Sequence, residues 1–177
     1  MNEISQQLVN GLALGAVYAL IAIGYTMVYG VLRFINFAHG DVFMLGSFTG
    51  FYLAPHVAKW FPLPGWGAWT VVMLLTMIIC AIIGITIELL AYRPLRNRPK
   101  LTVLITAIGV SLLIEYTCQH KAFFGASQKA FPKLLPAGNF TLGGLSFNTT
   151  QFVVLGVTLV LLVALTFVVK KIGRAHV

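Results

Sequence analysis

Long apolar runs alternate with short polar connections along this chain. Five runs are predicted as membrane segments, at residues 8–30, 34–54, 67–91, 101–118 and 151–169. An α-helix rises about 1.5 Å per residue, so roughly 20 apolar residues cross the hydrocarbon layer of a bilayer. The pattern therefore predicts an all-α, polytopic transmembrane protein in which residues 1–177 form a single membrane domain.

The second run differs from the others because polar residues stand near its beginning. These are Asn36, His39, Gly40 and Asp41. Ionisable groups at membrane depth cost several kcal/mol unless they face protein or water, so they are candidates for function. Gly40 also permits backbone geometry that a regular helix does not need. We expect a broken or re-entrant segment, whose polar bend either lines a substrate path or satisfies backbone groups freed by the break.

Composition excludes a soluble domain and a nucleic-acid-binding protein. The chain is 59% hydrophobic and 9% charged, whereas soluble domains carry roughly a quarter charged residues. Its net charge of +8 would suit nucleic acid only if the basic residues clustered on one folded polar face. They lie instead in short runs between apolar segments. Membrane lipid is therefore the expected surrounding, and nucleic acid is not an expected partner.

Two basic runs predict the orientation in the membrane. Residues 93–100 contain four cations, and Lys170, Lys171 and Arg174 follow the fifth segment. Loops rich in Lys and Arg stay in the cytoplasm, so both runs are expected there. Residues 121–150 and the connection 55–66 are then expected outside. The amino terminus is outside if the second segment spans the bilayer and inside if it re-enters.

Two further groups of residues have predicted structural roles. Glu88, near the inner end of the third segment, is expected to pair with Arg93 or Arg96, because long arginine side chains reach back to the membrane interface. A four-residue spacing of small residues lets another helix approach the first segment closely. The small residues are Gly11, Gly15 and Ala19.

The residues predict no enzymatic activity. His39 and Asp41 lack a third ligand at a spacing that would complete a metal site. No recognisable motif places a Ser or Cys nucleophile. The Gly-Lys-Ser/Thr loop that binds nucleotide phosphates is absent from the sequence. We therefore expect no catalytic residue, no metal and no cofactor in this chain.

Several runs of residues resemble one family. Residues 18–30, YALIAIGYTMVYG, and 35–41, INFAHGD, closely resemble the permeases of branched-chain amino-acid ABC transporters of the LivH type. Further similar residues are Glu88, YRPLR at 92–96, ITAIGVS at 105–111 and KIGRA at 171–175. The similarity covers essentially the whole chain. The INFAHGD run is specific to this superfamily, but it does not separate branched-chain amino acids from urea or short amides.

The resemblance implies a permease subunit of an ABC importer in the bacterial inner membrane. Its implied partners are separate ABC ATPase subunits that use the ATP, a second permease subunit and a periplasmic solute-binding protein. The implied substrate is a branched-chain amino acid. The alternatives are a urea or short-amide permease of the same superfamily, a channel that works without ATP, and a non-transporting membrane fragment.

The sequence departs from the family pattern in two respects. Family members are nearly twice as long, and in them the Gly-Arg-Ala at 173–175 opens a cytoplasmic segment that docks the ATPase. We therefore expect the chain to correspond to the amino-terminal part of such a permease. In addition, Glu115 stands where many relatives carry an amide. A carboxylate costs more to bury than an amide, which affects the expected packing there.

Overall fold

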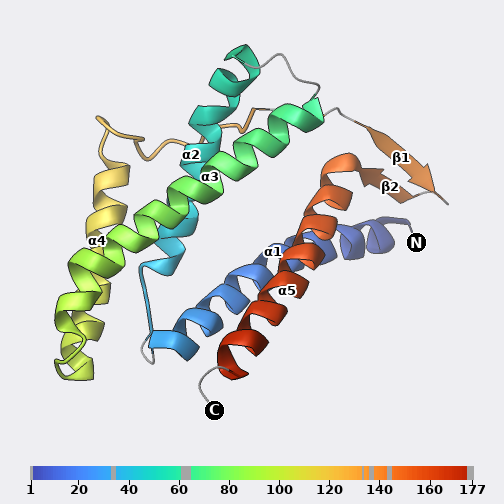
Figure 1. Ribbon diagram of the computed structural model, residues 1–177. Coiled ribbons are helices and arrows are strands. Elements are labelled where there is room, and N and C mark those ends of the chain that lie inside the picture. Colours follow the sequence, from blue (N-terminus) through green and yellow to red (C-terminus); the bar gives the residue numbers. More distant parts are fainter. Residues whose placement is uncertain are drawn as a thin grey trace. The chain divides into compact units, whose positions relative to one another are not determined.

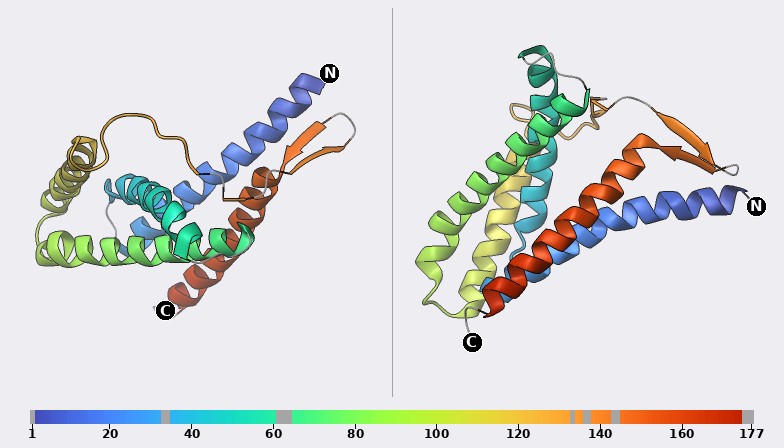
Figure 2. Two further views of the ribbon diagram at one scale, coloured as in Figure 1. Left: turned by 90° about the horizontal axis from the view of Figure 1, so that it is seen from above. Right: turned by 45° about the vertical axis from the view of Figure 1, so that its right-hand side comes forward.

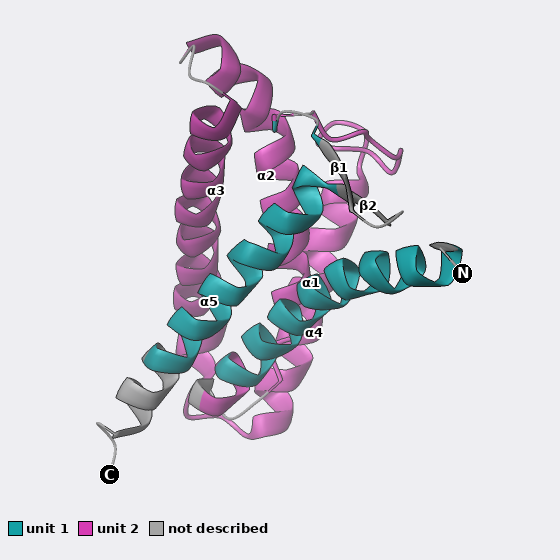
Figure 3. Ribbon diagram, turned by 90° about the vertical axis from the view of Figure 1, so that its right-hand side faces the viewer, with its two compact units in different colours: residues 1–27, 135–177 teal, residues 28–134 magenta. Residues whose placement is uncertain are grey.

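The computed structural model describes residues 2–32, 35–60, 65–132, 134–135, 138–142 and 145–174. Within these residues lie five α-helices, a π-helical turn, a 3-10 turn and a two-stranded hairpin. Contacts along the chain group into two compact units, coloured separately in Figure 3. Unit 1 comprises Met1–Met27 with Leu135–Val177, and unit 2 comprises Val28–Leu134. A single permease domain over residues 1–177 stays a prediction.

Within the part of the chain that the structure describes, four helices are long and apolar enough to cross a membrane. They are Glu3–Gly30, Gly65–Leu95, Lys100–Gln119 and Thr149–Phe167. They correspond to the first, third, fourth and fifth apolar runs. The predicted all-α, polytopic membrane fold is therefore confirmed.

Unit 2 is built around one long helix. α2 (His39–Trp60) and α4 (Lys100–Gln119) both contact α3 (Gly65–Ile87) or its continuation, the π-helical turn η1 (Glu88–Tyr92) (Figure 1). The 3-10 turn η2 (Arg93–Leu95) then leads towards α4. α2 and α3 form the most extensive helix contact, with a core at one end made of Ala54, Val57, Ala68 and Val72.

The second membrane segment begins and ends later than predicted. The prediction was 34–54, whereas α2 covers His39–Trp60, so the break precedes the helix instead of interrupting it. Pro55 was taken as the start of a connection, yet it lies inside α2. Val57 explains this continuation, because its side chain is 2% exposed and packs into the core shared with α3. Burial thus outweighs the helix bond that Pro55 cannot donate.

Unit 1 contains α1 (Asn2–Leu32, of which Val28 onwards belongs to unit 2), the strands β1 (Asn139–Leu142) and β2 (Leu145–Asn148), and α5 (Thr149–Arg174). The strands are antiparallel, with Asn139 opposite Asn148. Asn148 then caps α5, because its Oδ1 accepts the Thr150 N–H at 3.0 Å while its own N–H donates to Gln151 Oε1 at 3.0 Å. This reciprocal pair is a capping box, which explains the abrupt change from strand to helix.

A polar contact joins α1 and α5 inside unit 1. Gln151 Nε2 donates to Asn10 Oδ1 at 2.7 Å, and such bonds stabilise helix pairs in lipid. The small-residue face of Gly11, Gly15 and Ala19 is exposed. A methyl group added at Gly11 or Gly15 would meet no described atom within 4 Å. Packing of another helix on this face stays a prediction.

Candidate functional site

A tight turn precedes α2 and is organised by Asn36. The Ala38 N–H donates to Asn36 Oδ1 at 3.1 Å, and the His39 N–H donates to the Asn36 carbonyl at 3.2 Å. Asn favours such turns because its side chain bonds the backbone two residues on. The Val42 N–H then donates to the Ala38 carbonyl at 3.0 Å, which starts the helix. Residues 36–41 are called the polar turn below.

The polar turn is bound by Tyr92, the last residue of η1, which continues α3. The Tyr92 hydroxyl donates to Asn36 Oδ1 at 2.6 Å, across 56 positions of sequence. Only 4% of Tyr92 is exposed. Tyr92 belongs to the YRPLR run at 92–96, but the sequence does not mark it as a site residue. The sequence separation between Tyr92 and Asn36 does not indicate that they are in contact.

Contacts between α2 and α3 show how deep the polar turn lies. The Cys80 thiol donates to the Val42 carbonyl at 3.9 Å, and a Cβ added at Gly46 would lie 3.0 Å from Cys80 Sγ. Cys80 is 15 residues from either end of the span Gly65–Leu95, or about 20 Å along the helix. Val42, in the first turn of α2, therefore lies beside the middle of its neighbour's span, and the polar turn extends from there towards Tyr92, near the end of that span. Figures 1 and 2 show the non-helical chain reaching α2 part-way along α3.

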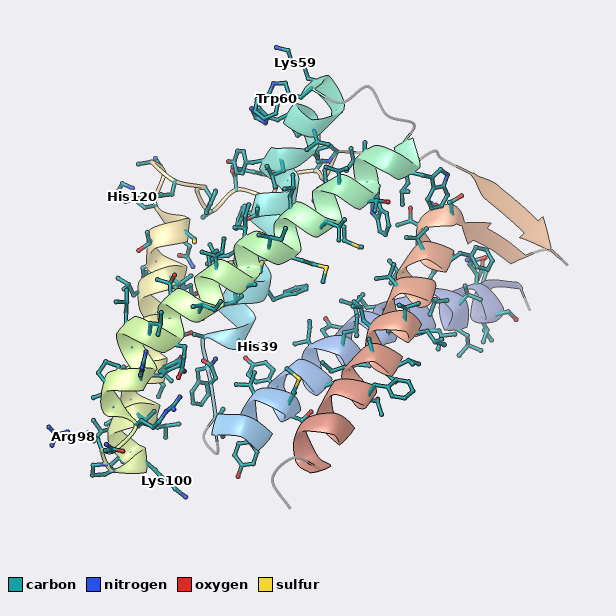
Figure 4. All side chains as sticks on the ribbon, viewed as in Figure 1. His39, Lys59, Trp60, Arg98, Lys100 and His120 are labelled. Atoms are coloured by element: carbon teal, nitrogen blue, oxygen red, sulfur yellow. The ribbon has the colours of Figure 1, made fainter. Side chains whose placement is uncertain are left out.

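The other candidate residues of the polar turn lie in the first turn of α2. His39 and Asp41 are partly buried, and Figure 4 shows His39 at the start of the helix. Asp41 Oδ2 is buried without a hydrogen-bond partner among the described residues. A carboxylate in this position interacts favourably with the helix dipole. Gly40 has helical backbone, and among the described glycines a positive φ occurs at Gly125.

An ion pair joins the start of η1 to the residue that follows η2. Arg96 Nη2 lies 2.7 Å from Glu88 Oε1, so of the two arginines considered, Arg96 makes this contact. The Arg96 side chain is 68% exposed and that of Glu88 is 30% exposed. Exposed pairs contribute about 0–1 kcal/mol. Figure 4 shows Arg98 and Lys100 at this same end of unit 2, called the basic end below.

An aromatic cluster covers the other half of α2. Lys129 Nζ donates to Tyr52 Oη at 2.6 Å and lies 5.0 Å from the centre of that ring. Phe124 stacks on Phe48 with centroids 4.4 Å apart, and Phe131 approaches Phe51 edge-on. Residues 120–132, called the aromatic segment, are thus fastened to α2. The sequence analysis did not predict these contacts.

The described residues do not gather metal ligands. Among them, no group of three or more His, Cys, Asp or Glu side chains is placed to hold a metal ion. Cys80 and Cys118 are free thiols. The polar turn can therefore offer hydrogen bonds and charge, through Asn36, His39 and Asp41, to a small polar solute.

Comparison with known proteins identifies the family. Residues 7–177 match the profile of a family described as "Branched-chain amino acid transport system / permease component". The chain belongs to this permease family. The resemblance inferred from the INFAHGD and YRPLR runs is therefore confirmed. Together with four membrane-crossing helices, membership shows a multi-pass bacterial membrane protein of a transport family rather than an enzyme family.

Individual relatives match nearly all of this chain. The high-affinity branched-chain amino acid transport system permease protein BraD of Pseudomonas aeruginosa is 40% identical over 181 residues, which cover 96% of the chain and 57% of BraD. The permease protein LivH of Escherichia coli K12 is 38% identical, over 96% of the chain and 56% of LivH. The chain thus spans somewhat more than half the length of these permeases. No solved structure has significant similarity to it.

Proposed function

We propose that the chain forms part of the permease subunit of an ABC importer that carries branched-chain amino acids across the bacterial inner membrane. The observation that carries this proposal is the family match over residues 7–177, with 40% identity to BraD. In this proposal the chain performs no covalent chemistry. Separate ATPase subunits hydrolyse ATP on the cytoplasmic side. A second permease subunit and a periplasmic binding protein complete the transporter.

We propose that the polar turn lies on the substrate path. A branched-chain amino acid carries an ammonium, a carboxylate and an apolar side chain, so it needs polar groups at membrane depth. Transporters commonly provide them where a helix is broken near the middle of the bilayer. The contact of Val42, in the first turn of α2, with Cys80 at the middle of the span Gly65–Leu95 supports this assignment.

Uptake of radiolabelled leucine tests the proposed function. A complete permease that contains this chain is produced together with ATPase, second-permease and binding-protein subunits, in bacteria that lack their own branched-chain amino-acid uptake, and the 177-residue chain alone, expected to give no uptake, is tested beside it. We expect leucine uptake that excess isoleucine or valine competes away and that an inactive ATPase abolishes. Uptake that persists without this chain would contradict the proposal. Competition by urea or short amides, but not by valine, would favour the related permease type.

Two matched substitutions in α2 test the polar turn. His39→Ala removes the imidazole at the start of the helix, whereas Phe43→Leu changes a side chain that is 50% exposed. Loss of a buried polar contact costs about 1–3 kcal/mol, so we expect His39→Ala to lower uptake roughly tenfold and Phe43→Leu to leave it nearly unchanged. Asp41→Asn shows whether the charge itself is needed. Normal uptake by both His39→Ala and Asp41→Asn, at normal membrane levels, would remove the polar turn from the path.

A further inference from the structure

The bond between Tyr92 and Asn36 joins the basic end of unit 2 to the start of α2. We propose that Tyr92 is a positioning residue for transport, which acts through Asn36 to hold the polar turn and to pass movement of residues 93–98 on to it. This inference rests on the proposed function, because it concerns the same polar turn. Tyr92 itself is not assigned a contact with the substrate.

Asn36 is held on several sides, and Tyr92 provides one of these contacts. A side-chain amide oxygen has two lone pairs. Asn36 Oδ1 uses one for the Ala38 N–H, at 3.1 Å, and the other for the Tyr92 hydroxyl, at 2.6 Å. The Asn36 carbonyl accepts the His39 N–H at 3.2 Å. The orientation of the amide therefore determines where the backbone of the polar turn lies, and Tyr92 constrains that orientation from another helix.

The local backbone around Tyr92 makes this contact possible. η1 is π-helical, and the Arg93 N–H donates to the Glu88 carbonyl. A π-helical turn contains an extra residue, is rare, and often occurs at functional sites. Here it lies between Glu88, which pairs with Arg96, and Tyr92, which is buried against Asn36. Pro94 in η2 then stiffens the chain directly after Tyr92.

Through Tyr92 and Asn36, these contacts connect residues 93–98 to the polar turn. Residues 93–98 follow Tyr92 directly and belong to the loop expected in the cytoplasm, where the proposed ATPase acts. A displacement of this loop moves Tyr92, and Tyr92 can move without losing its bond only if Asn36 follows. Coupling between distant sites needs an element with two arrangements. The polar turn with its bond to Tyr92 made or broken provides such an element.

The first test compares two tyrosines of unit 2. Tyr92→Phe removes the hydroxyl and keeps the ring, and Tyr116→Phe removes the same group from a side chain that is 68% exposed on α4. We expect Tyr92→Phe to lower the maximal rate of leucine uptake roughly two- to tenfold, which is the effect of one lost hydrogen bond. The half-saturating leucine concentration should stay unchanged, because Tyr92 does not touch the substrate. Tyr116→Phe should behave like the unchanged chain.

The second test asks whether Tyr92 acts through Asn36. If it does, the double variant Tyr92→Phe/Asn36→Ala transports no more slowly than Asn36→Ala alone, since both changes break one link. Effects that multiply would show that Tyr92 acts independently of Asn36 and would overturn the proposal.

The third test follows the polar turn without any need for transport. Ala38 is fully buried, so an Ala38→Cys thiol, in a chain with Cys80→Ser and Cys118→Ser, reports opening of the turn by its rate of reaction with N-ethylmaleimide. We expect Tyr92→Phe to raise this rate roughly two- to tenfold and Tyr116→Phe to leave it unchanged. If Tyr92→Phe does not accumulate in membranes, Asn36→Ala must give the same increase.

The outcomes separate the two proposals. If no version of the complete permease that contains this chain supports leucine uptake, the proposed function fails, and the thiol reaction still decides the role of Tyr92. If Tyr92→Phe matches the unchanged chain in both uptake and thiol reaction, the role of Tyr92 is overturned while the proposed function stands.

Discussion

Gly46 of α2 lies close to α3. Among the glycines described, it leaves the least room for an added Cβ. A Cβ built at Gly46 would come within 3.0 Å of Cys80 Sγ, whereas one built at Gly50 would meet its neighbours at 3.6 Å. A larger residue at Gly46 would separate the helices just beside the polar turn. The size of this side chain is therefore limited by packing between the two helices.

Alanine at two glycines should measure this limit. Gly46→Ala crowds Cys80, whereas Gly84→Ala, on α3, meets no described atom within 4 Å. Both changes gain the same helix propensity, so their difference isolates the crowding. We expect Gly46→Ala to be less stable than Gly84→Ala by about 1–3 kcal/mol, measured by thermal unfolding in detergent. Cys80→Ala should restore part of the loss. Equal stability of the two alanine variants would show that the helices accommodate the added methyl group.

For single residues, the sequence identifies some members of the site and cannot identify others. Asn36, His39 and Asp41 are visible because polar groups stand out within an apolar run. Tyr92 is not visible, because its partner lies 56 positions away. The choice of Arg96 over Arg93 as the partner of Glu88 is also hidden.

Among the elements, each of the long apolar runs predicts a helix whose ends lie within six residues of the expected ones. α2 differs from the others because both of its ends are shifted in the same direction along the chain. Its start depends on the hydrogen bonds of Asn36, and its end depends on burial of Val57. The aromatic segment is not predicted, because its position depends on individual contacts between Lys129, Phe124 and the rings of α2.

Lys129 should fasten the aromatic segment to α2. Its ammonium bonds Tyr52 Oη at 2.6 Å and faces three rings at 5.0–6.0 Å. Exposed contacts of a cation with an aromatic ring contribute about 0.5–1 kcal/mol. We expect Lys129→Ala to speed chymotrypsin cleavage within residues 120–132 roughly two- to fivefold. Lys129→Arg keeps the charge and should stay near the unchanged rate. Lys121→Ala serves as the control, and an equal effect of Lys121→Ala would exclude a specific role for Lys129.

At the scale of the whole molecule, the arrangement of unit 2 and the orientation predicted from the basic runs together indicate the side of the membrane on which the amino terminus lies. Asn36 contacts Tyr92 at the basic end, and α1 ends at Leu32, four residues before Asn36. α2 then leads away to Trp60, which Figure 4 shows far from the basic end. If the basic end is cytoplasmic, as positive loops require, α1 ends inside and the amino terminus lies outside.

Thiol labelling from outside the cell tests this topology. In a chain with Cys80→Ser and Cys118→Ser, we expect a membrane-impermeant maleimide to modify Glu3→Cys and Ser127→Cys and to leave Asn97→Cys unmodified. Glu3 is a suitable site because acidic residues contribute little to orientation. Labelling after membrane disruption controls for reactivity. Labelling of Asn97→Cys in intact cells would reverse the assignment, and protection of Glu3→Cys alone would place the amino terminus inside.

The polar beginning of α2 also affects how the protein is made. α2 lies outside the four helices that are apolar enough to cross the bilayer on their own, since it carries His39, Asp41, His56 and Lys59. The ribosome completes α2 before α3, and only residues 61–64 separate them. We therefore expect α2 to stay at the membrane surface until α3 emerges, so that the two helices enter the bilayer together as a hairpin. The order of synthesis thus makes α3 the insertion partner of the helix that carries the polar turn.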